Sequence, residues 1–120
     1  MGRPVVVIGS RLGKGQKIAV GIEKEGGEAI VIPGIGADMK LADKMKEVNA
    51  DLGLSFCGSG GAGALNAQNL YGYKCKYEMR SIEQGEVAIA EGVQALGFVF
   101  MDTEELGSSV VKAWKKKYGE

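Results

Sequence analysis

The sequence has 120 residues, 45% hydrophobic and 25% charged, and its 15 basic residues balance 15 acidic ones. This length and composition predict one ordinary globular domain over residues 1–120. The neutral balance argues against nucleic acid or an anionic membrane surface as a partner, and no apolar run is long enough to insert into a membrane. The chain start is too short for a signal peptide, so we expect a cytoplasmic location.

Histidine is absent, which excludes Ser-His and Cys-His nucleophilic pairs and histidine-ligated zinc. Any acid–base chemistry must therefore use Asp, Glu, Lys, Tyr or Cys. The two cysteines, Cys57 and Cys75, lack the close spacing of a zinc ribbon or a disulfide framework. We expect free thiols, no metal and no cofactor.

The first part of the chain predicts two strand-helix units. The β-branched run Val5–Ile8 is typical of a strand buried on both faces, and a helix over 17–24 follows it. A second strand is predicted over 29–32. Apolar residues at helical spacing over 41–48 then indicate a helix.

Two side chains are positioned to bound that second helix, Asp38 as the cap of its start and Asn49 at its end. The run 52–57 predicts the third strand, which leads into a glycine-rich loop. A short helix is expected from Ala64 onward.

The alternation of apolar and charged residues over 73–79 predicts a half-exposed fourth strand at an edge of the sheet. Ser81 and Gln84 match a capping box, which starts the next helix. Each of these signals is local in the chain.

A fifth strand is predicted over 96–101, and Asp102 with Glu105 matches a second capping pattern before the last helix. Five such units predict an α/β fold: an open, mostly parallel, doubly wound sheet with helices on both faces. In such sheets ligands bind beyond the carboxyl ends of the strands.

The most informative segment is the glycine-rich stretch directly after the third strand. Consecutive backbone N–H groups there, next to a helix start, suit an anion, and Ser59 could add a hydroxyl donor. A purely structural loop, whose glycines permit close packing, is the alternative. The candidate anion-binding residues in this loop are Gly58, Ser59, Gly60, Gly61 and Gly63.

Cys57 lies at the mouth of this loop, where N–H dipoles would lower the pKa of a thiol. It is therefore the candidate catalytic residue, with a small buried apolar side chain as the alternative. Arg11 and Lys14 follow the first strand and could bring cations to the same ligand, joined by Arg80 after the fourth strand.

Two familiar nucleotide motifs are only partly matched. Gly58, Gly60 and Gly63 satisfy the dinucleotide spacing, but they follow the third strand, and few residues remain to complete such a site. The loop over 9–15 falls one residue short of a Walker A motif and lacks its Ser or Thr.

The run Ser55-Phe56-Cys57-Gly58-Ser59, with its glycine-rich continuation through Asn66, resembles the bacterial glycine-rich SFCGS family over essentially the whole chain. The resemblance implies a small bacterial protein whose relatives are encoded beside membrane proteins and sugar-acid catabolic enzymes. The loop is also distantly similar to the phosphocysteine loop of sugar phosphotransferase IIB components, in which the cysteine follows the first strand.

Two classes of function follow. The first is a module that binds an anionic or phosphorylated metabolite at the Cys57 loop and works with membrane transport components in sugar or sugar-acid transport or metabolism. The alternative is a homo-oligomeric structural or regulatory subunit without ligand chemistry, whose fourth strand pairs with another copy. A small enzyme that uses Cys57 as nucleophile is a third possibility.

Overall fold

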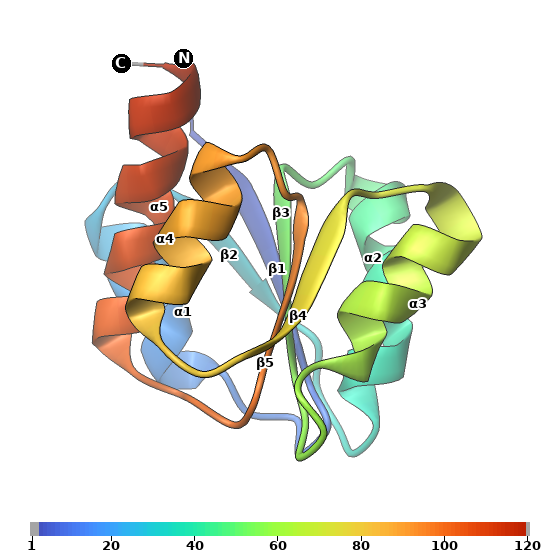
Figure 1. Ribbon diagram of the computed structural model, residues 1–120. Helices are drawn as coiled ribbons and strands as arrows, with labels where there is room; N and C mark the ends of the chain where they lie inside the picture. The colour runs from blue at the N-terminus through green and yellow to red at the C-terminus, as the bar shows by residue number, and fades with distance from the viewer. Residues whose placement is uncertain (1–2, 120) are drawn as a thin grey trace.

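Five parallel strands in the order β2-β1-β3-β5-β4 form the sheet of the computed structural model, which describes residues 3–119 (Figure 1). The strands are β1 (Val5–Ser10), β2 (Glu28–Val31), β3 (Leu52–Phe56), β4 (Cys75–Met79) and β5 (Ala95–Phe98). The helices are α1 (Gln16–Lys24), the 3-10 helix η1 (Ala37–Lys40), α2 (Leu41–Val48), α3 (Ala62–Tyr71), α4 (Ile82–Ala90) and α5 (Glu104–Tyr118).

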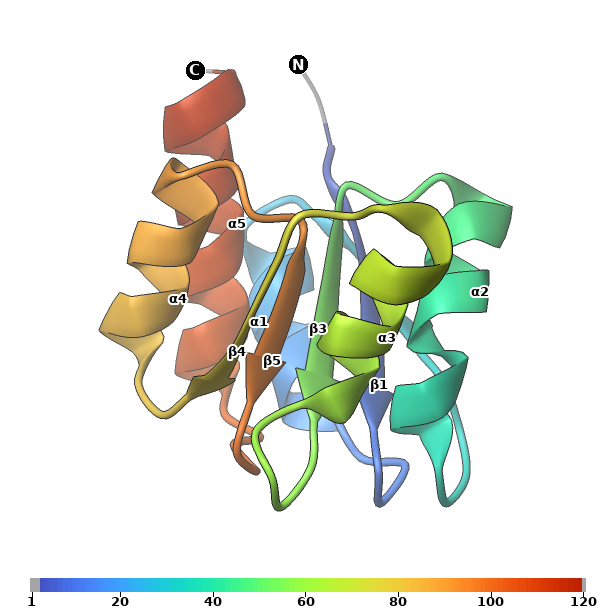
Figure 2. The ribbon, with the colours of Figure 1, turned by 45° about the vertical axis from the view of Figure 1, so that its right-hand side comes forward.

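The helices form a layer on each face of the sheet. Helices α1, α4 and α5 cover one face, and α2 and α3 with η1 cover the other (Figure 2). The three-layer α/β fold predicted from the sequence is therefore confirmed, and every strand pair is parallel.

Strands β1 and β3 are neighbours, but the helices that follow them lie on opposite faces of the sheet. Helix α1, after β1, belongs to the α1/α4/α5 layer, whereas α3, after β3, belongs to the other layer. The carboxyl edge between β1 and β3 is thus the point where such folds place ligands.

The two faces of the central strands carry side chains of different size. Ile8, Leu54 and Phe98 belong to the core under α1, α4 and α5, whose members are large. The opposite face of the same strands has a row of small residues, because Gly9 on β1 pairs with Ser55 on β3, which pairs with Gly97 on β5. Backbone can therefore approach the sheet closely on that face.

Several local predictions are confirmed. Asn49 ends α2 in the left-handed conformation at φ 54°, and Ser81 and Gln84 form the expected capping box of α4. Strand β4 lies at the sheet edge, with a break in register between Lys76 and Met79.

Three predictions about element ends are wrong. Asp38 does not cap α2, because the chain first forms η1 and Asp38 is buried within it. Thr103, not Asp102, caps α5 through its hydroxyl, which accepts the N–H of Leu106. Strand β5 ends at Phe98, so the residues up to 101 form part of a loop at the carboxyl edge.

Within residues 3–119, no helix is long and apolar enough to cross a membrane.

Candidate functional site

The row of small residues on β1, β3 and β5 lets three segments of backbone contact the sheet. A side chain at Gly9 would lie 2.8 Å from the carbonyl oxygen of Ala37, in η1. One at Gly63, in the first turn of α3, would overlap the carbonyl oxygen of Asp38. One at Gly97 would lie 2.7 Å from the carbonyl oxygens of both Gly60 and Gly61. The row therefore seats η1, α3 and the glycine loop on the sheet.

This packing orients the peptide groups of the glycine loop. The carbonyls of Gly60 and Gly61 face Gly97, and the Gly60 carbonyl accepts the N–H of Glu78 at 2.8 Å. Because N–H and C=O point in opposite directions across a trans peptide, the next N–H groups along the chain point away from the sheet. They reach the Cys57 sulfur, with Gly61 N at 3.1 Å and Ala62 N at 3.3 Å from Sγ.

The Cys57 side chain is thus held at the start of α3 as a hydrogen-bond acceptor. The Ser59 hydroxyl lies 3.2 Å from Sγ, and Cys57 is only 1% exposed. Burial raises the pKa of the Cys57 thiol, but the hydrogen bonds from the Ser59 hydroxyl and the backbone of Ala62 and Gly61 outweigh it and leave the pKa below its ordinary value. The arrangement favours a thiolate.

Cys75 provides a contrast within the same chain. It lies half-buried on the edge strand β4, and burial raises the pKa of its thiol. It therefore stays protonated to a higher pH than an exposed cysteine.

Two of the glycines predicted to bind an anion, Gly60 and Gly61, support this sulfur, and anion binding by the loop stays a prediction. Gly60 and Gly61 adopt φ 106° and 94°, a region that other residues rarely enter. The N–H groups of Gly61 and Ala62 are directed to Cys57, and that of Gly60 donates to the Cys57 carbonyl at 3.2 Å. Only Gly58 and Ser59 of the predicted set are exposed to solvent.

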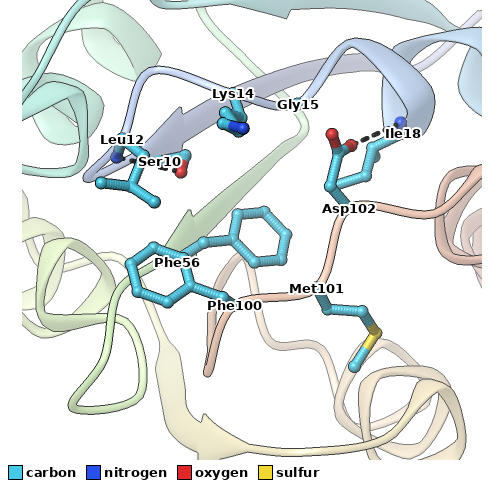
Figure 3. A pocket seen from close by; sticks show the side chains of 9 residues that line it. All are labelled: Ser10, Leu12, Lys14, Gly15, Ile18, Phe56, Phe100, Met101 and Asp102. Carbon is cyan, nitrogen blue, oxygen red and sulfur yellow. Dashed lines mark hydrogen bonds between the residues drawn. The ribbon is translucent and has the colours of Figure 1, made fainter.

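A cavity of about 210 Å³ opens at the same carboxyl edge, beside the end of β3. The loop after β1 forms one wall and the loop after β5 the other, with Phe56 between them (Figure 3). Phe100 also approaches the Cys57 loop, since a side chain at Gly58 would lie 3.9 Å from its ring. The lining residues are Ser10, Leu12, Lys14, Gly15, Ile18, Phe56, Phe100, Met101 and Asp102.

The predicted cations occupy different places along this edge. Lys14 lines the cavity. Arg11 has an exposed side chain, while its backbone N–H donates to the Phe56 carbonyl at 2.8 Å and so fixes the β1 loop to the end of β3. Arg80 is exposed after β4, and its N–H donates to Gln84. Only Lys14 is among the residues that line the cavity.

The lining residues that sequence reasoning missed as site residues include Ser10, Phe56, Phe100 and Asp102. The sequence predicts Phe100 in a strand and Asp102 as a helix cap. Asp102 instead accepts the N–H of Ile18, in the first turn of α1, at 3.2 Å from Oδ1. The usable signal is their position at or shortly beyond the carboxyl end of a strand, since such residues reach the edge where ligands bind.

Two polar groups lie buried near the start of α3. The Asp38 carboxylate and the Ser55 hydroxyl are fully buried and have no hydrogen-bond partner among the described residues. Both residues contact Gly63, so they lie beside the helix turn that holds Cys57.

The fold defines a class that solved structures also represent. Type B ribose 5-phosphate isomerase of Trypanosoma brucei superposes with a TM-score of 0.70 at 15% identity, over 94% of this chain and 85% of that one. The Mycoplasma genitalium ribose-5-phosphate isomerase B with bound ribulose-5-phosphate gives 0.66 at 16% identity, over 96% and 86%. The Clostridium thermocellum enzyme gives 0.66 at 21% identity, over 93% and 84%. At these identities the likeness establishes a shared fold.

The chain itself belongs to the Glycine-rich SFCGS family, whose profile matches residues 4–117. The expected family is therefore confirmed. No curated protein matches the chain.

Proposed function

We propose that this protein binds a small phosphorylated sugar at the carboxyl edge between β1 and β3, next to a thiolate at Cys57. The observation that carries the proposal is the set of hydrogen bonds to the Cys57 sulfur, which lowers the pKa of its thiol. Perturbed nucleophiles of this kind cluster at functional sites. Cys57 directly follows Phe56, which lines the cavity, although Cys57 is not itself a lining residue.

The charges and the fold agree with a phosphorylated ligand. Lys14 lines the cavity and Arg11 is exposed beside it, and neither forms an ion pair with a described residue. The structural neighbours are named as isomerases of a sugar phosphate, and one holds ribulose-5-phosphate. Ribose 5-phosphate is therefore the first probe.

Thermal stabilisation tests the binding. At ten times its dissociation constant, ribose 5-phosphate would stabilise the fold by about 1.4 kcal/mol, or roughly 5 °C in Tm. Free ribose would stabilise it less, and Lys14→Gln would reduce the shift caused by ribose 5-phosphate. Lys44→Gln, on helix α2 and outside the cavity lining, serves as the control for the loss of a positive charge. The proposal fails if no sugar phosphate shifts the Tm.

A second candidate, isomerisation of the bound sugar, is favoured specifically by the thiolate. A base beside the carbonyl of an aldose can take the proton from the adjacent carbon and return a proton to the carbonyl carbon, while the proton of the adjacent hydroxyl moves to the former carbonyl oxygen, which gives the ketose. Incubation of ribose 5-phosphate with the protein in D2O would then place deuterium on carbon, as seen by NMR. Cys57→Ser would abolish the exchange, and Cys75→Ser would leave it intact.

The remaining expectations are an assembly subunit and membrane transport partners. Strand β4 lies at an edge of the sheet, but Glu78 at φ 64° and the break in register leave a short edge for pairing with another copy. Light scattering over a range of concentrations tests the assembly: a persistent multimer would support it, and a monomer would exclude it. The transport partners stay a prediction from the family resemblance.

A further inference from the structure

The cavity between the β1 and β5 loops has a charge at each wall. Lys14 comes from the β1 loop, and Asp102 comes from the β5 loop on the other side (Figure 3). Most of the remaining lining is apolar, including the rings of Phe56 and Phe100. A ligand in this cavity therefore meets a cation at one end and a carboxylate at the other.

Asp102 is fixed in place by a helix start. Its Oδ1 accepts the N–H of Ile18 in the first turn of α1, where a carboxylate also interacts favourably with the helix dipole. Among the described residues nothing else hydrogen-bonds to this side chain, so Oδ2 is open to a ligand. The chain itself thus supplies the anion at this helix start, and a ligand phosphate or carboxylate is repelled there.

We propose that Asp102 determines the ligand class of the cavity by accepting hydrogen bonds from the hydroxyl groups of a short polyhydroxy chain, whose anionic end lies toward Lys14. The inference rests on the proposed binding of a phosphorylated sugar and adds its orientation and its selecting residue. Asp102 is half-buried, so a ligand in the cavity covers its free oxygen, and a ligand without hydroxyl groups leaves that oxygen unpaired and loses affinity for that reason.

The size of the cavity limits the ligand further. About 210 Å³ is below the range of roughly 300–1,000 Å³ typical of sites for drug-sized molecules. A chain of a few hydroxylated carbons fits this volume.

Two ligands of the wild-type protein give a direct test. Ribose 5-phosphate and pentyl phosphate share a phosphate and five carbons, but only the first has hydroxyl groups. The mostly apolar lining alone would favour pentyl phosphate, whereas a selecting Asp102 makes ribose 5-phosphate bind about tenfold or more tightly by calorimetry. Tighter binding of pentyl phosphate would overturn the inference.

Variants test whether the preference for ribose 5-phosphate depends on Asp102. Asp102→Asn keeps an acceptor for the Ile18 N–H and should reduce the preference for ribose 5-phosphate about tenfold, while the affinity for inorganic phosphate does not fall, because the substitution only removes a repelling charge. Glu105→Gln, an exposed carboxylate on the following helix, should change neither. Lys14→Gln should weaken ribose 5-phosphate and inorganic phosphate together.

The outcomes separate the two proposals. If the wild type binds none of ribose 5-phosphate, pentyl phosphate and inorganic phosphate, the proposed function itself fails. If it binds them but Asp102→Asn leaves the preference intact, only the role of Asp102 is refuted. The Ile18 amide signal in NMR adds a readout of position, since ribose 5-phosphate should shift it and inorganic phosphate should not.

Discussion

Two glycine-rich contacts in this protein look alike in the sequence and differ in what they do. Between α1 and α5, a side chain at Gly21 would overlap the carbonyl oxygen of Glu104, and one at Gly107 that of Ile18. In the loop after β3, a side chain at Gly61 would overlap the Cα of Gly97, and one at Gly97 would lie 2.7 Å from the Gly60 carbonyl oxygen. Both places use glycine to bring backbone against backbone.

The difference lies in the peptide groups that the packing turns outward. Gly21 and Gly107 lie inside regular helices, whose N–H and C=O groups bond along the helix. Gly60 and Gly61 lie in a loop, and their carbonyls face the sheet while the following N–H groups reach the Cys57 sulfur. The first contact only stabilises the fold, whereas the second also sets the chemistry of a thiol.

The largest effect is expected from a methyl group in the helix contact. Gly107→Ala forces apart two helices that touch through backbone, which should cost about 3 kcal/mol despite the higher helix propensity of alanine. Urea unfolding followed by circular dichroism measures the loss. Gly85→Ala on α4 is the helical control and should cost clearly less, because an added methyl group meets side chains there, the Phe98 ring at 3.0 Å and Leu96 at 3.8 Å, and no backbone.

The pH profile of Cys57 alkylation separates the two contacts. In the folded Gly107→Ala protein this profile should match that of the wild type. A changed profile would mean that the helix contact also affects the thiol, and the distinction between the two glycine contacts would fail.

A smaller loss of stability is expected in the loop, with a change in chemistry beside it. Gly61→Ala introduces strain at φ 94° and overlap with Gly97, at a cost of about 2 kcal/mol, and displaces an N–H from Cys57. The pKa of the Cys57 thiol should then rise. Gly34→Ala is the matched control, because φ is 93° there but no atom lies within 4 Å of an added side chain.

The two Gly→Ala variants at positive φ separate the cost of backbone strain from the cost of overlap with neighbouring atoms. Gly34→Ala should lose only the strain energy, about 1 kcal/mol, with no change at Cys57. Equal losses for both variants, and no rise in the Cys57 pKa for Gly61→Ala, would show that the packing on Gly97 does not orient the loop.

Local sequence patterns predicted most of the fold. The β-branched run of β1, the alternation along β4 and the capping box at Ser81 each depend on neighbours in the chain. The same reasoning placed Cys57 at the end of the third strand, next to a helix start. Periodicity and capping are sufficient for such features because their interactions are short in sequence.

The rest of the site depends on contacts between distant segments. Asp102 matched a capping pattern, but its partner is Ile18, on a helix near the other end of the chain. Asp38 matched one too, yet the packing of η1 against Gly63 buries it. The direction of the loop carbonyls depends on Gly97, which no local pattern links to Gly61. Tertiary packing decided each case, so the sequence located the thiol but not the cavity between the β1 and β5 loops.

The smallest effect on stability is expected when the Ser59 hydroxyl beside the Cys57 thiol is removed. Ser59→Ala removes the hydrogen bond to Cys57 Sγ without touching the glycine packing, so the pKa of the Cys57 thiol should rise toward its ordinary value. Alkylation by iodoacetamide against pH, in a Cys75→Ala background, measures it. Ser108→Ala, which removes a hydroxyl bonded to Glu25, should leave the profile unchanged.

Linkage fixes the direction of the pH effect on stability. Because the folded pKa of Cys57 lies below its unfolded value, the thiolate stabilises the fold at pH above the unfolded pKa, and this contribution is lost as the pH falls through the folded pKa. Wild type and Ser59→Ala should therefore differ by about 1 kcal/mol at high pH and by less at low pH. Urea unfolding of both proteins across this range measures the difference. A gap that widens on acidification would mean that the fold prefers the neutral thiol, and the loop after β3 would then be a packing device like the contact between α1 and α5.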